Sequence, residues 1–205
     1  MKLIVVGGHT RNIGKTSVMA GLIRDLKSFA WTAVKITKYG HGICSRDGEP
    51  RECAPTEHDF VLAEEADPRG RADTCRFLGA GARRSLWLRV REGQLAAALP
   101  TLSQTLSDDE HVIIESNSIL GFLKPAAYLV VLDRARRDFK TSARQFLGRA
   151  DALVPVGAGP DVRTWPDLDS GILRRKRVFP VSPPSYANPE LCLFVQQRLG
   201  RTILQ

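Results

Sequence analysis

The sequence predicts an α/β fold in which helices cover both faces of one doubly wound, mainly parallel β-sheet. Three observations predict it. Short apolar runs recur along the 205 residues and alternate with segments of helical periodicity. The first apolar run leads into a glycine-rich turn and the triplet Gly-Lys-Thr at 14–16. No repeat or linker divides the chain, so strands alternating with helices predict a single domain over 1–205.

The composition is that of a globular protein, with 43% hydrophobic and 25% charged residues. No apolar run approaches the length of a membrane span, and Met1–Val6 is too short for a signal peptide, so we expect a cytoplasmic protein without a membrane partner. The formal net charge of +8 favours anionic ligands such as nucleotides and phosphorylated metabolites. Because no basic stripe is interleaved with aromatic residues, we do not expect nucleic acid as a ligand.

The main functional signal lies between the first predicted strand, 3–6, and the first predicted helix, 18–26. A strand, a glycine-rich turn, Gly-Lys-Thr and a helix stand in the order that a phosphate-binding P-loop requires. The expected nucleotide-binding residues are Gly8, His9, Thr10, Arg11, Asn12, Ile13, Gly14, Lys15, Thr16 and Ser17.

The residue types of this loop suit a nucleoside triphosphate. Backbone N–H groups at the start of a helix point at an anion, and the helix dipole adds to their effect. Lys15 would contact the outer phosphates, and the Thr16 hydroxyl would bind Mg²⁺. Five residues separate Gly8 from Gly14, one more than in the usual motif, and His9 stands where glycine is expected. A glycine-rich turn into an ordinary helix is the alternative interpretation.

A second strand is predicted over Trp31–Lys38, which is rich in β-branched residues. Lys35 and Lys38 stand near its end. Because the carboxyl ends of parallel strands face the ligand crevice, both lysines are candidates for contacting an anionic substrate. A position on a solvated strand edge is the alternative, mainly for Lys38.

Residues 39–70 form a long polar segment, which we expect to be a lid-like loop with a short helix over Glu57–Glu65. The segment contains two histidines and two cysteines at short spacings: His41, Cys44, Cys53 and His58. These four residues could form a tetrahedral zinc site, although their intervals are not those of a standard zinc finger. A loop with unrelated thiols is the alternative.

The rest of the chain continues the alternation of helices and strands. The predicted elements are a helix over 71–82, a strand over 85–90, a helix over 94–106, strands over 112–115 and 127–133, a helix at 143–147, strands over 151–157 and 177–181, and a final helix. Pro100 is expected to bend or break its helix. Asn188 and Pro189 are typical of the start of the final helix. The basic run 134–140 is expected to be mostly a solvated helix start.

The strand over 112–115 ends in the second functional signal. In P-loop proteins an acid at such a strand end binds Mg²⁺ directly or through water and can orient a nucleophile. We therefore expect Lys15 and Glu115 to be catalytic, and Thr16 and Glu115 to hold Mg²⁺. Ser116 and Asn117 follow at the same crevice and are expected to bind substrate. The alternative for Glu115 is an acid that caps the next helix.

Together these features resemble the molybdopterin-guanine dinucleotide biosynthesis adapter family. The likeness rests on the first strand with 14–17, on 34–38, and on 73–82, which is similar to the family's Asp-Ser/Thr, short helix and Ala-Gly-Ala. The strand ending at Glu115 falls where the family has Val-Glu-Gly. The resemblance implies GTP binding, weak hydrolysis and a partner enzyme.

The chain also departs from that family. Ser116 follows Glu115 in place of glycine, and Lys38-Tyr39 replaces a histidine pair. The loop spacing is similar to that of dethiobiotin synthetase, which also has a lysine in the place of Lys35. This second resemblance implies ATP-dependent phosphorylation of a carboxylate or carbamate, often in a homodimer.

Three functions are therefore open from the sequence. The first is a Mg²⁺-dependent nucleotidase or adapter in molybdenum-cofactor or related cofactor metabolism, using GTP or ATP. The second is an ATP-dependent kinase or ligase acting on a small anionic substrate. Both would make the protein an NTP hydrolase or phosphotransferase. The third is a nucleotide-gated metal-binding module built on the zinc-site candidates. No Asn-Lys-x-Asp follows the strand over 151–157, so the base is undetermined.

Overall fold

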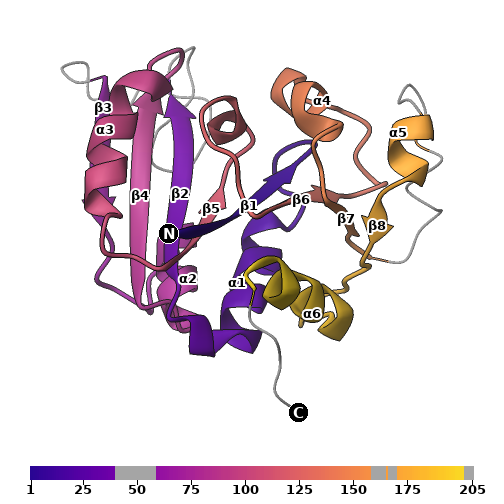
Figure 1. Cartoon of the computed structure of the whole chain (residues 1–205), viewed down its shortest axis with the longest axis horizontal. Coiled ribbons are helices and arrows are strands. Elements are labelled where there is room, and N and C mark those ends of the chain that lie inside the picture. The colour runs from indigo at the N-terminus through magenta and orange to yellow at the C-terminus, as the bar shows by residue number, and fades with distance from the viewer. Residues whose placement is uncertain (40–58, 158–164, 166–169, 201–205) are drawn as a thin grey trace.

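The computed structural model describes residues 1–39, 59–157, 165 and 170–200. One eight-stranded sheet runs through the molecule in the order β3-β4-β2-β5-β1-β6-β7-β8 (Figure 1). The strands are β1 (Lys2–Gly8), β2 (Thr32–Tyr39), β3 (Phe60–Glu64), β4 (Arg84–Arg91), β5 (His111–Glu115), β6 (Ala127–Leu132), β7 (Ala152–Pro155) and β8 (Arg177–Val178). The α-helices are α1 (Lys15–Asp25), α2 (Asp73–Gly79), α3 (Leu95–Thr105), α4 (Thr141–Leu147), α5 (Ser170–Arg174) and α6 (Pro189–Arg198).

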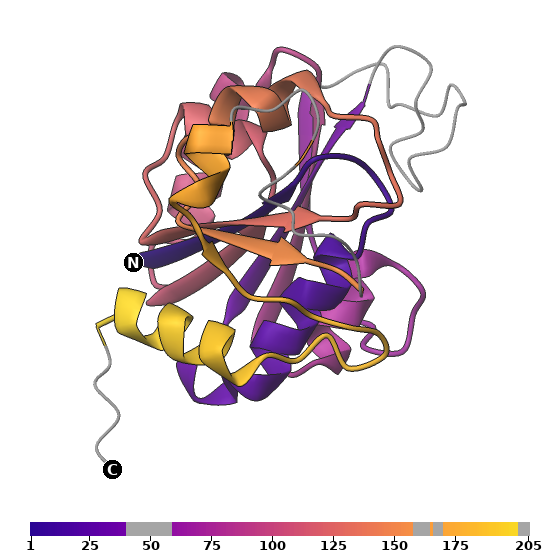
Figure 2. The same cartoon turned by 90° about the vertical axis from the view of Figure 1, so that its right-hand side faces the viewer.

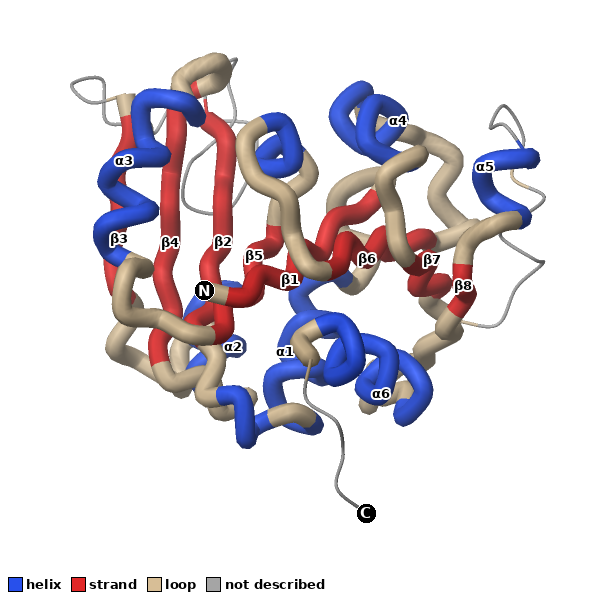
Figure 3. The backbone as a smooth tube through the Cα atoms, in the orientation of Figure 1, coloured by secondary structure: helices blue, strands red, loops and turns tan. Residues whose placement is uncertain are grey.

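The strand pairs are parallel except for β3 with β4. The predicted α/β fold with a doubly wound, mainly parallel sheet is therefore confirmed. Helices α1 and α6 lie on one face of the sheet, and α4 and α5 lie on the other (Figures 2 and 3). None of the helices in the described ranges combines the length and the apolar character needed to cross a bilayer.

Two apolar cores fill the space between these layers, and β1 contributes to both. Ile4 and Val6 pack into the core under α1 and α6. Leu3 and Val5 point to the opposite face and join the core under α3 and α4. Successive side chains of a strand point to opposite faces, so a continuous apolar run is what a strand buried on both sides requires. The central strand β1 thereby places the loop that follows it over the middle of the sheet.

The predicted helix over Glu57–Glu65 is wrong for the part that the structure describes. Residues Phe60–Glu64 form β3, an edge strand antiparallel to β4, in which Leu62 faces Leu88. Phe60 and Leu62 pack against the core under α3. Alternate apolar residues at these two positions suit a half-buried strand better than a helix. Within the expected lid-like segment, residues 60–64 are therefore strand, and residues 40–58 lie outside the described part.

Helix α3 runs without interruption from Leu95 to Thr105, so of the bend or break predicted at Pro100, the break is wrong. Proline removes one helical hydrogen bond, here to the carbonyl of Ala96. The helix persists because Ala98 and Leu102 are buried in the core against the sheet. The final helix begins as predicted: the Asn188 side chain accepts a hydrogen bond of 3.0 Å from the Leu191 backbone N–H.

Candidate nucleotide-binding site

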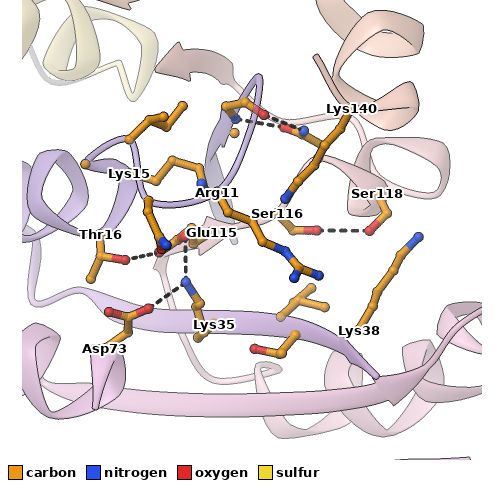
Figure 4. A pocket seen from close by; sticks show the side chains of 18 of the residues that line it. Arg11, Lys15, Thr16, Lys35, Lys38, Asp73, Glu115, Ser116, Ser118 and Lys140 are labelled. Atoms are coloured by element: carbon orange, nitrogen blue, oxygen red, sulfur yellow. Dashed lines mark hydrogen bonds and ion pairs between the residues drawn. The ribbon is translucent and has the colours of Figure 1, made fainter. Parts of the chain in front are cut away.

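An open cleft of about 1430 Å³ lies at the carboxyl ends of β1, β2 and β5. The P-loop, residues 8–17, lines the cleft, and Lys140 of the segment between β6 and α4 lines it beside the P-loop (Figure 4). Among the described residues that line the cleft, seven are cationic and three are acidic: Arg11, Lys15, Lys35, Lys38, Arg71, Arg76 and Lys140 against Asp73, Glu92 and Glu115. The cleft therefore favours anionic ligands.

The P-loop turns tightly onto the start of α1. Gly14, the N-cap of α1, has a φ of 86°, a conformation that glycine adopts without steric cost. A Cβ atom on Gly8 would come within 2.8 Å of the Lys15 side chain and 2.9 Å of Ile13. The first N–H groups of a helix have no partner within the helix, so this turn presents donors to an anion.

Lys15 folds back over the loop that carries it. Its ammonium donates a hydrogen bond of 2.7 Å to the carbonyl oxygen of Thr10. Burial lowers the pKa of Lys15, whereas the negative charge of Glu115 acts in the opposite direction. A buried ammonium with a single carbonyl partner is suited to exchange that partner for phosphate oxygens.

A continuous chain of polar contacts joins α1, β5, β2 and α2. The Thr16 hydroxyl donates to Glu115 Oε2 at 2.7 Å. Lys35 Nζ lies 2.6 Å from Glu115 Oε1 and 2.7 Å from Asp73 Oδ2 (Figure 4). The Glu115 side chain is only 3% exposed, so Lys35 supplies the countercharge that a buried carboxylate needs.

The pKa values of this chain reflect its pairing. Burial acts to lower the pKa of Lys35, but the neighbouring charges of Glu115 and Asp73 raise it overall. For Asp73, burial acts to raise the pKa, but the charge of Lys35 lowers it overall. At neutral pH both side chains are therefore charged.

The donor atoms at this point fit Mg²⁺. The Thr16 hydroxyl and the carboxylates of Glu115 and Asp73 are oxygen ligands, which Mg²⁺ prefers. The sequence analysis had named Thr16 and Glu115 for this role and had missed Asp73. Asp73 is the first residue of α2, a position in which acids are common, so its local sequence indicates a helix start and not a ligand.

Asn117 holds the P-loop to β5. Its Oδ1 accepts from the Gly8 backbone N–H at 3.0 Å, and its Nδ2 donates to the Gly8 carbonyl at 2.9 Å. The Tyr128 hydroxyl donates to the same Oδ1 at 3.1 Å. A Cβ atom on Gly7 would overlap Asn117 Oδ1, so glycine is required there. Asn117 lines the cleft as well, and its predicted contact with substrate stays a prediction.

Ser116 and Lys38 line the part of the cleft beyond Lys35. Ser116 Oγ lies 3.3 Å from Ser118 Oγ, so two hydroxyl groups stand side by side at the end of β5 (Figure 4). Lys38 is partly exposed, with the Glu92 carboxylate 4.0 Å away. The structure thus places Ser116 and Lys38 in the cleft that contains Lys15, and their binding of substrate remains a prediction.

His9 and Thr10 direct their side chains away from the cleft. His9 is fully buried, with ring centroids 5.2 Å from Phe139 and 4.9 Å from Trp165. The Thr10 hydroxyl donates to the Asp138 carboxylate. These side chains anchor the loop, and only their backbone is left for the predicted contact with phosphate.

Three cleft cations, Arg71, Arg76 and Lys140, come from residues that the sequence analysis had not assigned to the site. Arg76 of α2 donates to the Ser17 hydroxyl at 2.8 Å. Lys140 belongs to the run that was expected to be mostly solvated. Residues 135–138 of that run are exposed, as expected, but Lys140 is half-buried and lines the cleft. Its position in the segment that connects the buried strand β6 to α4 is the signal that could have identified it.

The zinc-site candidates His41, Cys44, Cys53 and His58 lie outside the described residues. Within the described ranges, no group of three or more histidine, cysteine, aspartate or glutamate side chains is placed to hold a metal ion. Cys75 and Cys192 are free thiols. Zinc therefore receives no support from the structure.

No family model matches the chain, and no curated protein matches it in sequence. Solved structures do match in fold. HypB from Helicobacter pylori in complex with nickel has a TM-score of 0.50 at 14% identity, with 98% of this chain and 90% of that chain covered. The hydrogenase maturation factor HypB from Archaeoglobus fulgidus has a TM-score of 0.54 at 12% identity, with 97% and 90% covered.

The signal recognition particle 54 kDa protein from Aeropyrum pernix K1, in complex with GDP, has a TM-score of 0.51 at 15% identity. That match covers 97% of this chain and 46% of the other. At such identities the similarity shows the fold alone. The chain therefore shares its α/β fold with these proteins, whereas the adapter family that the sequence resembles is not shown.

Proposed function

We propose that the protein binds GTP or ATP with Mg²⁺ in the cleft and catalyses hydrolysis or transfer of the terminal phosphate. The observation that carries this proposal is the hydrogen bond between Thr16 and Glu115, placed at the start of α1 beside Lys15. A P-loop hydroxyl, an acid at a strand end and the P-loop lysine are the three groups that this chemistry requires.

Each residue has a distinct role in this proposal. Lys15 exchanges the Thr10 carbonyl for oxygens of the outer phosphates and stabilises the charge that develops on them. Thr16 would hold Mg²⁺, with Glu115 beside it as a second ligand or through water. The bound ion would neutralise the triphosphate and align it with the attacking group. Lys35 supplies the countercharge beside Glu115, whose carboxylate accepts the hydrogen bond from Thr16.

The more specific proposal is a nucleotidase or adapter, similar to the molybdopterin-guanine dinucleotide biosynthesis adapters, that acts with a partner enzyme in cofactor metabolism. Its support is the sequence resemblance and the cleft that Lys15, Thr16 and Glu115 line. Slow turnover that a partner protein accelerates would be its signature.

One observation favours a second candidate, a kinase or ligase with a small anionic substrate. The described cleft residues carry four more positive than negative charges. A triphosphate with Mg²⁺ brings about two net negative charges, so positive charge is left over for a second anion. Lys38 and Ser116 stand where that substrate would bind. Turnover that is negligible alone and rises with a small carboxylate or carbamate would favour this candidate.

Thermal unfolding with GTP, ATP, GDP and ADP, each with Mg²⁺, tests the shared proposal. A bound nucleotide raises the unfolding temperature by mass action, and the larger shift identifies the base. Lys15→Ala should abolish the shift, whereas Lys27→Ala, an exposed lysine outside the cleft, should retain it. Equal shifts for wild type and Lys15→Ala would contradict the assignment of the P-loop.

A further inference from the structure

The segment between β6 and α4 is attached to the P-loop at three points. The Thr10 hydroxyl donates to Asp138, and the Lys140 backbone N–H donates to the His9 carbonyl at 2.8 Å. His9 Nε2 lies 3.2 Å from the Arg136 carbonyl oxygen. The path of this segment is therefore set by the first residues of the P-loop.

His9 fills an aromatic socket under that segment. Its ring packs against both Phe139 and Trp165, which also contact each other, and the guanidinium of Arg134 stands 5.3 Å from the centre of the Trp165 ring. His9 is the position at which this loop has a side chain in place of the expected glycine. In this structure that side chain points away from the phosphate site. It contacts the segment that follows β6, the strand beside β1 in the sheet.

The consequence of this attachment is the position of the Lys140 side chain. Lys140 extends into the cleft toward the space between Arg11 and Ser116 (Figure 4). Within the described ranges, no side chain forms a hydrogen bond or ion pair with its ammonium. Burial and the positive charges of Lys15, Arg11 and Lys35 lower the pKa of Lys140 to about 8, against the opposite effect of the Asp138 charge.

An ammonium in this position is suited to bind an incoming anion. Lys15 approaches the phosphate site from α1, whereas Lys140 approaches it from the segment between β6 and α4 (Figure 4). In phosphoryl transfer, negative charge spreads over the oxygens of the terminal phosphate, and cations arranged around it stabilise the transition state. Placing such a cation in advance avoids reorganisation during the reaction.

We propose that Lys140 contacts the terminal phosphate of the bound triphosphate and that His9 is the positioning residue that holds Lys140 there. This inference rests on the proposed nucleotide-binding function. It adds a catalytic cation from outside the P-loop, and it gives the extra loop residue a role.

Binding measurements on GTP or ATP and on the matching diphosphate, with Mg²⁺, test the contact. Lys140→Ala should weaken triphosphate binding about tenfold, because a charge-assisted hydrogen bond is lost, and should change diphosphate affinity less than twofold. Lys140→Arg should restore the preference for triphosphate. The control is Arg137→Ala, an exposed residue of the same segment that does not line the cleft.

The number of protons taken up on triphosphate binding is a second readout. It would differ between wild type and Lys140→Arg only if Lys140 contacts the phosphate, and not if Lys140 had a merely structural role. At pH 8, about half of the Lys140 side chains are neutral in the free protein, and a bound phosphate would protonate them. Calorimetry of triphosphate binding in two buffers of different ionisation enthalpy should show about half a proton more taken up by wild type than by Lys140→Arg. The comparison with Lys140→Arg removes any contribution from Lys15.

The role of His9 is tested by coupling. His9→Phe keeps a ring in the socket and removes the contact with Arg136, so the triphosphate preference should fall while the protein stays folded. In the Lys140→Ala background the same substitution should change that preference no further. Additive effects would overturn the positioning role.

The outcomes separate the two proposals. If wild type binds neither nucleotide, the proposed function is wrong, and this inference is wrong with it. If wild type binds triphosphate and Lys140→Ala matches it in affinity and in proton uptake, only the inference is overturned. Equal losses for triphosphate and diphosphate in Lys140→Ala would also overturn it.

Discussion

At the scale of single residues, the buried charges of the cleft are stabilised by contacts with one another and with the backbone. Lys35 satisfies Glu115 and Asp73 at once, and Lys15 is held by a backbone carbonyl. A buried charge without a partner is costly, so these contacts keep the site folded before a ligand arrives. The groups that we propose to bind phosphate and metal are thus also the groups that pair with one another in the free protein.

Glu115→Gln tests the acid. The substitution keeps the shape of the side chain but removes the charge beside Thr16, so half-maximal turnover should need about tenfold more Mg²⁺. Titration of activity with Mg²⁺ measures this shift. Glu92→Gln, at another acidic residue of the cleft, serves as the matched control and should behave as wild type. An unchanged Mg²⁺ requirement in Glu115→Gln would remove Glu115 from the metal site.

Asp73 predicts a dependence of stability on pH. The pKa of Asp73 is lower in the folded state than in the unfolded chain, where the ordinary value is about 3.9. The ionised side chain therefore adds to the free energy of unfolding above that pH, and this contribution is lost as the pH falls below it. Asp73→Asn should therefore reduce the loss of unfolding free energy between pH 6 and 3, pH values that we choose to bracket this transition. Urea unfolding at a series of pH values measures it. Parallel curves for both proteins would contradict the assignment.

At the scale of elements, the sequence predicted the helices and strands whose formation depends on neighbouring residues in the chain. Strands β1, β2, β5 and β6 and helices α1 and α6 follow from apolar runs, helical periodicity and the Asn188 cap. The two errors have tertiary causes. Pairing with β4 makes 60–64 a strand, and packing on the sheet carries α3 through Pro100. Neither partner is visible in a short window of sequence.

Asn188→Ala tests the predicted start of α6. The variant loses the hydrogen bond to the Leu191 N–H and should lower the free energy of unfolding by about 1 kcal/mol. Chemical denaturation measures the loss. Asn188→Ser retains a capping oxygen and should recover most of it. Because α6 lies away from the cleft, nucleotide affinity should be the same in all three proteins, and a change in affinity would show that α6 does more than pack.

At the scale of the whole molecule, the parallel sheet explains which parts of the site the sequence could predict. Lys15 and Glu115 were predicted because each ends or follows a buried strand, and neighbouring parallel strands bring such positions together. Asp73 and Lys140 were missed because they arrive from a helix start and a connecting segment. Their distance from the P-loop depends on contacts such as Thr10 with Asp138, which no periodicity encodes.

Removal of metal is a test at this scale. Lys35 bridges the two carboxylates and Arg76 also pairs with Asp73, so the free protein should not need Mg²⁺ to fold. EDTA should leave the unfolding temperature unchanged without nucleotide and should abolish the increase that a triphosphate produces. A fall in the unfolding temperature on adding EDTA alone would mean that a resident metal supports the fold.

The bridge made by Lys35 also implies an order of events. Free Mg²⁺ would have to compete with an ammonium that is already seated between Glu115 and Asp73, and it would bring no compensating negative charge. In the proposed complex, a triphosphate would bring its own magnesium and would give Lys15, Lys35 and Lys140 new anionic partners. The ion should therefore enter as part of the nucleotide complex and leave with the product. Lys35 would thus disfavour the binding of Mg²⁺ without nucleotide.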